Sequence, residues 1–210
     1  APSANLSGKP SPTTAEHVRA DLAGRIAAIV DGGATGVGVE STVIDMTATP
    51  PMILRPGGVT YEQLQAVLGN VDVDPSFLVG AEASPRSPGM KYTHYAPQGE
   101  LWLVSGKSAA AQEQMEKMLA EAKRNGLKTG VLATAETSAA WEQASCVDEV
   151  LSCGSAADLG SVARDLYAVL RRFDELGVQF IVSPVFPRTG MGLAVMNRLE
   201  KAAGGRIITV

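Results

Sequence analysis

The chain has 210 residues, of which 45% are hydrophobic and 19% are charged, a composition typical of a globular protein with one large or two small domains. Its net charge of −4 includes no basic block, so charge gives no indication of nucleic-acid binding. No apolar run approaches the roughly 20 residues that a membrane-spanning helix needs. Composition therefore predicts no membrane partner.

The cysteines and histidines are few and are spaced unlike metal ligands. Cys146 and Cys153 are the only cysteines, and their spacing matches no zinc or redox motif. Two cysteines in a chain of this size favour a reduced, cytoplasmic protein. His17 and His94 lie far apart in the sequence, so we expect no metal site.

Two sequences typical of capping boxes predict two short helices near the start of the chain. The stretch Thr13–Glu16 predicts a helix that begins with Thr13 as its cap and ends near Leu22. Thr60, followed by Gln63, predicts a second helix that continues to residue 68.

Three strands are expected between and beside these helices, at Arg25–Asp31, Val37–Met46 and Met52–Arg55. Such a set is too small for a self-sufficient α/β domain. The chain also opens at Ala1 without a methionine and proceeds directly into motif-like sequence. We therefore expect residues 1–69 to be part of a larger α/β domain whose remaining strands are encoded upstream.

Residues 70–98 are rich in Pro, Gly and Ser and are expected to link two domains. Unlike an ordinary linker, this segment contains two tyrosines within Ser87–Pro97, together with Lys91 and His94. Two interpretations are open. The segment is either a strap that joins the domains or a strap that lies over an active site and contacts a ligand.

Residues 99–210 show a regular alternation of strands and helices, which predicts a Rossmann-like, doubly wound domain with a parallel five-stranded sheet. The expected strands are Leu101–Val104, Thr129–Ala133, Glu149–Leu151, Val178–Val182 and Ile207–Val210. The expected helices are Ser108–Asn125, Ala135–Ala144, a long helix capped by Ser155–Asp158 and ended by Gly177, and Gly192–Ala203. This domain is expected to fold alone.

Two glycine-containing turns in this domain lack the full pattern of a nucleotide-binding motif. Ser105–Ser108 lacks the first glycine of a phosphate-binding loop, because Leu101 occupies its place. Gly190–Gly192 lacks the third glycine of a dinucleotide fingerprint, since Val195 stands there. We interpret the first as a turn with a helix cap and reject a nucleotide-binding motif at both.

Three polar features of residues 1–69 are candidates for ligand binding. The first, Ser3–Thr13, offers hydroxyls and backbone donors before a helix, as either an anion cradle or a capped turn. The triplet Glu40–Thr42 belongs to an edge strand or to a strand end that faces a ligand. Arg55, at the end of an apolar strand, is placed either to bind phosphate or to face solvent.

Four ordered motifs resemble threonylcarbamoyl-AMP synthases of the two-domain type, in which a YrdC-like domain is joined to a smaller Rossmann-like domain. The motifs are Ser-Ala-Asn-Leu-Ser-Gly-Lys-Pro-Ser-Pro-Thr, Gly-Val-Glu-Ser-Thr-Val-Ile-Asp, Ile-Leu-Arg-Pro-Gly and Ser-Pro-Gly-Met-Lys-Tyr-Thr-His-Tyr-Ala-Pro. Residues Gly192–Leu199 also resemble the family.

This resemblance implies a nucleotidyltransferase that converts L-threonine, bicarbonate and ATP into threonylcarbamoyl-AMP and pyrophosphate. The product is used for the N6-threonylcarbamoyl modification of tRNA adenosine, so a downstream tRNA-modifying transferase complex is an implied partner. ATP is a substrate, Mg²⁺ is expected to accompany it, and RNA is a further partner to be considered. The catalytic residues stay unassigned.

The resemblance also implies roles for individual residues. By motif position, Ser3 and Ser41 correspond to threonine-binding residues. The implied ATP-binding residues are Asn5, Thr13, Arg55, Tyr92 and Tyr95. The family's Lys-x-Arg motif does not occur before Ser3, so the activity is expected of a longer parent protein and not of this chain alone. A non-catalytic regulator of the same fold that binds RNA or a nucleotide is the alternative.

Overall fold

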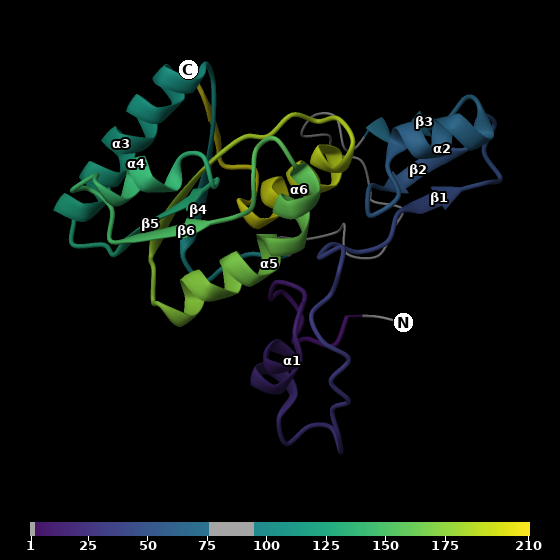
Figure 1. The fold of residues 1–210 in the computed structure, drawn as a ribbon, viewed down its shortest axis with the longest axis horizontal. Coiled ribbons are helices and arrows are strands. Elements are labelled where there is room, and N and C mark those ends of the chain that lie inside the picture. Colours follow the sequence, from purple (N-terminus) through teal and green to yellow (C-terminus); the bar gives the residue numbers. More distant parts are fainter. Residues whose placement is uncertain (1–2, 76–94) are drawn as a thin grey trace.

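A computed structural model describes residues 3–75 and 95–210 of the chain. Figure 1 shows the five-stranded sheet with its helices on the left, a small N-terminal sheet with its helix on the right, and a separate N-terminal helix below. Tyr92, Lys91 and His94 lie outside the described residues.

The two predicted N-terminal helices are present. Helix α1 spans Ala15–Leu22, but its cap is Thr14, whose hydroxyl accepts a hydrogen bond from the amide of His17. The prediction that Thr13 caps this helix was wrong, because Thr13 is buried and its N–H donates to Nδ1 of His17 at 3.1 Å. Helix α2 spans Tyr61–Leu68 and has the predicted capping box of Thr60 and Gln63.

The N-terminal sheet has three short strands, β1 (Val43–Asp45), β2 (Met52–Arg55) and β3 (Asp72–Val73), in that spatial order. Strand β2 is confirmed as predicted; it pairs with β1 antiparallel and with β3 parallel. Strand β3 was not predicted, since a pairing of two residues leaves no hydrophobic periodicity in the sequence.

Two of the strand predictions need correction. The strand expected at Val37–Met46 is reduced to β1, because Gly38 adopts a left-handed φ of 79° that breaks the extended backbone. The stretch Arg25–Asp31 is not a strand: it has no partner strand among the described residues, and Val30 is 94% exposed. Alternating apolar residues form a strand only where a neighbouring strand accepts their backbone hydrogen bonds.

The prediction of a parallel five-stranded α/β domain is confirmed, with the strand order β6-β5-β7-β4-β8. Its strands are β4 (Glu100–Ser105), β5 (Thr129–Ala133), β6 (Glu149–Ser152), β7 (Phe180–Pro184) and β8 (Ile207–Thr209). Its helices are α3 (Ser108–Arg124), α4 (Ser138–Glu142), α5 (Leu159–Glu175) and α6 (Met191–Ala202). Strand β7 begins later than predicted because the Val178 amide still bonds to Phe173 at the end of α5.

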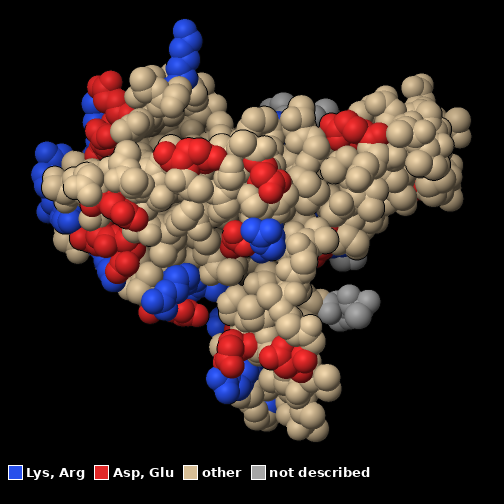
Figure 2. Space-filling model, viewed as in Figure 1, with Lys and Arg blue, Asp and Glu red and all other residues tan. Residues whose placement is uncertain are grey.

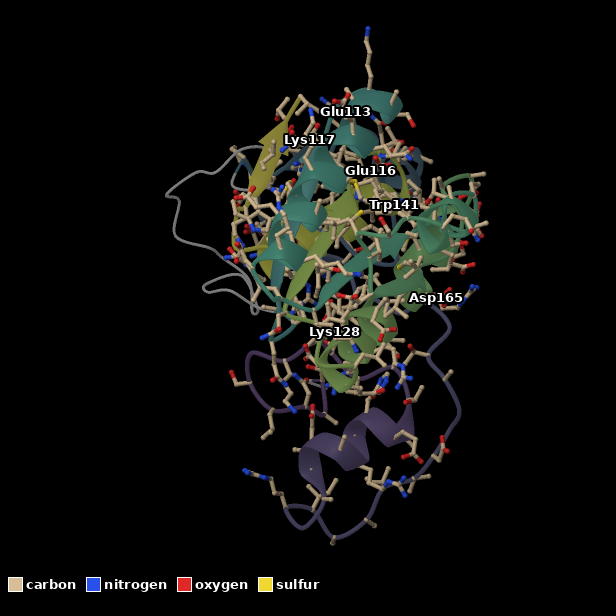
Figure 3. The ribbon with its side chains drawn as sticks, turned by 90° about the vertical axis from the view of Figure 1, so that its left-hand side faces the viewer. Glu113, Glu116, Lys117, Lys128, Trp141 and Asp165 are labelled. Carbon is tan, nitrogen blue, oxygen red and sulfur yellow. The ribbon has the colours of Figure 1, made fainter. Side chains whose placement is uncertain are left out.

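Helices cover both faces of this sheet, so alternate residues of each strand enter different cores. Leu103 of β4 and Leu132 of β5 pack with α5 and α6 in one core. Their neighbours Val104 and Val131 pack with α3 and α4 in the other. Trp141 of α4 belongs to this second core, and Figure 3 labels it beside α3.

The outer face of α3 is polar, as is usual for a helix that covers a sheet. Glu113 and Lys117, labelled in Figure 3, form an exposed ion pair at 2.7 Å on this face. Helix α4 begins three residues later than predicted, because the amide of Thr134 bonds to the Thr137 hydroxyl in a preceding turn. Among the helices in residues 3–75 and 95–210, none combines the length and the apolar character needed to cross a membrane.

Candidate active site

A cleft of about 810 Å³ lies where the N-terminal part meets helix α5. Its walls come from parts of the chain that are distant in sequence. They are residues of the segment 3–12, the segment 35–41, Arg55, Tyr95 and Tyr167.

Five of the seven residues that the sequence singled out line this one cleft: Ser3, Asn5, Ser41, Arg55 and Tyr95. Thr13 does not line it; the buried Thr13 side chain instead lies 3.3 Å from Nδ1 of His17. Tyr92 lies outside the described residues. The roles of all seven in binding threonine or ATP stay predictions.

Asn5 shapes the first wall of the cleft by closing a turn. Its side-chain amide donates to the carbonyl oxygens of Leu6 at 2.9 Å and Lys9 at 3.2 Å. Gly8 within this turn has a left-handed φ of 90°. The turn exposes the small side chains of Ser3 and Ser7 toward the cleft.

Ser41 and Arg55 are joined directly across the second wall. The Arg55 guanidinium donates to the Ser41 carbonyl oxygen from Nε at 3.1 Å and from Nη2 at 3.0 Å. Nη2 also lies 3.3 Å from the Ser41 hydroxyl oxygen. Arg55 is thus a cleft residue fixed at a strand end and not a freely solvated cation.

Glu40 lies at the centre of a buried polar network. Its carboxylate accepts hydrogen bonds from the Ser11 hydroxyl at 2.6 Å, from the Tyr167 hydroxyl at 2.9 Å and from Nε of Arg198 at 2.9 Å. Burial opposes ionisation of Glu40, but the Arg198 charge and the Ser11 hydrogen bond outweigh it, so the pKa of Glu40 lies below its ordinary value. Glu40 therefore stays ionised at neutral pH.

Tyr95 packs against the same network from the end of the motif-bearing segment. Its ring lies 5.2 Å from the ring of Tyr167, and the Arg198 guanidinium lies 5.8 Å from its centroid. It is the only residue besides glycine with a positive φ, 67°, in the described chain. Burial raises the pKa of both phenols, so both remain protonated hydrogen-bond donors.

A second polar contact attaches the N-terminal segment to helix α5. The guanidinium of Arg171 bonds to the Asp21 carboxylate at 2.7 Å and to the Pro10 carbonyl oxygen at 2.6 Å. Lys9 adds a third interaction with Asp21 at 3.0 Å. Both charged partners from α1 and α5 are almost fully buried.

No motif or spacing in the sequence singles out Tyr167, Arg171 or Arg198. Tyr167 and Arg171 occur on the buried face of α5, where the spacing is that of core residues. Arg198 occurs in the stretch Gly192–Leu199, which resembles the family but indicated no role for this residue. In the part of the chain that the structure describes, no three His, Cys, Asp or Glu side chains are grouped to hold a metal ion.

Comparisons with known proteins give one consistent result. The family model described as "Threonylcarbamoyl-AMP synthase, C-terminal domain" matches residues 59–204, and a model described as "Telomere recombination" matches residues 1–57. The chain is 53% identical over 208 residues to a threonylcarbamoyl-AMP synthase of Bacillus subtilis, covering 99% of this chain and 58% of that protein. A threonylcarbamoyl-AMP synthase of Pyrococcus abyssi is 44% identical over 210 residues, covering 100% and 59%.

A solved structure is similar over the same length. The crystal structure of P. abyssi Sua5 complexed with L-threonine superimposes with a TM-score of 0.88 at 43% sequence identity. The match covers 100% of this chain and 58% of that one. The chain thus spans slightly less than three fifths of the length of the relatives that it matches.

Proposed function

Because this chain belongs to the threonylcarbamoyl-AMP synthase family, we propose that the full-length protein makes threonylcarbamoyl-AMP. The proposed reaction joins L-threonine, bicarbonate and ATP, and releases pyrophosphate and water. The product would feed the N6-threonylcarbamoyl modification of tRNA through a downstream transferase complex.

One observation carries this proposal. Ser3, Asn5, Ser41, Arg55 and Tyr95 were selected from four separate motifs, and all five line one cleft of about 810 Å³. A cleft of this size holds a nucleotide together with a small amino acid. Residues brought together from distant motifs in this way are typical of a binding site.

Four of these five cleft residues have a chemical role in the proposal. The hydroxyls of Ser3 and Ser41 would bind the carboxylate or ammonium group of threonine. Arg55, whose guanidinium lies beside Ser41, would stabilise charge on the phosphates as pyrophosphate leaves. Tyr95 offers an aromatic face and a protonated hydroxyl to the nucleotide.

ATP would enter this cleft as its Mg²⁺ complex. Glu40 is the only acidic side chain among the described residues of the cleft, and it is already bonded to Ser11, Tyr167 and Arg198. We therefore propose that the triphosphate, and not Glu40, carries the Mg²⁺ ion into the site.

The proposal extends to the cellular setting. The free thiols of Cys146 and Cys153 suit a reducing compartment, which supports a cytoplasmic location. Binding of RNA would need a basic surface. On the face shown in Figure 2, basic and acidic side chains are interspersed and form no large basic patch.

The alternative function is a non-catalytic regulator that binds RNA or a nucleotide. Binding without chemistry would explain the cleft equally well, so the decisive measurement is turnover. We expect the purified full-length protein to release pyrophosphate only when ATP, threonine and bicarbonate are all present. Binding of ATP without such release would favour the regulator.

The 210-residue chain provides the comparison. It spans 58% of the Bacillus relative, and we expect it to release no pyrophosphate under the same conditions. Turnover by this chain alone would contradict the expectation that further catalytic residues lie in the rest of the protein.

A further inference from the structure

We propose that Arg198 of helix α6 is a positioning residue that fixes Ser41 and Arg55 in the cleft, acting through Glu40 and Pro56. This inference rests on the proposed function only where it names threonine and ATP as the ligands. The positioning concerns the shape of the cleft, and it can be tested without threonine or ATP.

Arg198 holds the chain immediately beside both cleft residues. Its Nε donates to the Glu40 carboxylate at 2.9 Å, and Glu40 directly precedes Ser41. Its Nη1 donates to the Pro56 carbonyl oxygen at 2.8 Å, and Pro56 directly follows Arg55. One guanidinium thus ties together the two segments whose side chains meet in the Ser41–Arg55 contact.

The antiparallel ladder between the two segments ends at the pair of Val43 and Arg55. Residues 38–42 and 56–59 lie beyond it, where they are joined by the Thr42 hydroxyl, which donates to the Val59 carbonyl oxygen at 2.5 Å, and by Arg198. The backbones nevertheless approach closely: a Cβ atom on Gly57 would lie 2.2 Å from the Glu40 carbonyl oxygen. Arg198 is 0% exposed and bonds to both segments beside this approach.

Helix α5 provides a second support for the same segment. The Tyr167 hydroxyl donates to Glu40 at 2.9 Å, and a Cβ atom on Gly38 would lie 2.3 Å from Cα of Arg164. The segment 38–41 is therefore held from both α5 and α6. It follows that the five-stranded domain, although outside the proposed chemistry, sets the geometry of the cleft.

The first test measures kinetics in the full-length protein with Arg198→Met, Arg198→Lys and Tyr167→Phe. Arg198→Met should raise KM for threonine and for ATP by about 10-fold, since the cleft loses its fixed geometry. Arg198→Lys keeps the charge but cannot donate to Glu40 and Pro56 as a fork, so a smaller rise is expected. A residue needed only for folding would lower the amount of active enzyme and leave KM unchanged.

The matched control is Arg124→Met, the same substitution at an exposed position on α3, and it should leave KM unchanged. Tyr167→Phe conserves volume, and it keeps the proposal testable if Arg198→Met does not fold. Unchanged KM values in both Tyr167→Phe and Arg198→Lys would overturn the proposal.

The second test needs no ligand and separates this inference from the proposed function. Amide hydrogen exchange is measured on the 210-residue chain and on its Arg198→Lys and Tyr167→Phe variants. The amide of Val59, which donates to the Thr42 hydroxyl at 3.1 Å across the two segments, should exchange about 10-fold faster in the variants, while the amides of β5 keep their protection. Equal exchange at Val59 in all three proteins would overturn the positioning role, whatever reaction the full-length protein performs.

Discussion

At the scale of single residues, the cleft depends on side chains that each make more than one contact. Arg55 bonds to Ser41 and, in the proposed function, also stabilises charge on the phosphates, so the two roles can be separated only by comparing substrates. Asp21 is similar: Arg171 and Lys9 both act on its carboxylate, and the contact attaches one wall of the cleft to α5.

We predict that Arg55→Ala in the full-length protein weakens the use of ATP more than the binding of threonine. A charge-assisted contact to phosphate is worth about 1.5–3 kcal/mol, which corresponds to a loss of about 10- to 150-fold. Steady-state kinetics with each substrate varied in turn would measure this difference. The control is Lys117→Ala on the outer face of α3 (Figure 3), which should change neither value.

An equal loss for both substrates would contradict a phosphate role for Arg55. It would instead indicate that the main effect of the guanidinium is to hold Ser41 in place.

Asp21 gives a prediction about pH. Burial alone would raise the pKa of Asp21. The hydrogen bonds and charges of Arg171 and Lys9 have the larger effect and lower this pKa to about 2. Because this value lies below that of the unfolded chain, the contribution of Asp21 to stability is present above about pH 4 and is lost as pH falls toward 2. Asp21→Asn should therefore destabilise the chain at pH 7, by about 3 kcal/mol, and by less at pH 3.

Urea unfolding of wild type and variant at both pH values would measure this change. The control is Asp165→Asn on the same helix as Arg171 (Figure 3). Because the pair of Asp165 with Arg164 is exposed, this substitution should change the free energy of unfolding by less than about 0.5 kcal/mol at either pH. A destabilisation by Asp21→Asn that is the same at pH 7 and pH 3 would contradict the ion-pair explanation.

At the scale of elements, prediction succeeded where the pattern was local. Helix α2 was predicted with its capping box, and strands β2 and β5 with their bounds, because caps and alternation act over a few neighbouring residues. It failed for Arg25–Asp31 and for most of Val37–Met46, where an apolar pattern lacks the partner strand or the regular backbone that a sheet requires. The polar triplet at Glu40 proved to be a segment before a strand, facing the cleft and the network with Arg198.

At the scale of the whole molecule, the five-stranded domain has both of its cores within its own sequence, apart from contacts with Tyr95 and Val39. We predict that residues 99–210 fold alone. The polar side chains of Tyr167, Arg171 and Arg198 would then be hydrated instead of buried, which removes the need for their N-terminal partners.

Urea unfolding followed by circular dichroism and by tryptophan fluorescence would test this prediction. Trp102 and Trp141 are the only tryptophans of the chain, and both belong to the domain, so fluorescence reports on it directly. Coincident, cooperative transitions are expected. A gradual change, or two different midpoints, would contradict an independent domain that begins at Gly99.

The amino-acid sequence by itself determined the α/β alternation, the parallel sheet of the second domain, the family and five residues of the cleft. These features depend on spacing along the chain, which a sequence displays directly. Only the tertiary structure decided that Ser41 bonds to Arg55, that Thr13 turns toward His17, and that Tyr167 and Arg198 hold Glu40. The physical reason is that the contacts of Glu40 join segments up to 158 residues apart, whose approach depends on the packing of whole elements. The Thr13–His17 contact is local, but it replaces the cap that the sequence pattern indicated, and no hydrophobic pattern distinguishes the two.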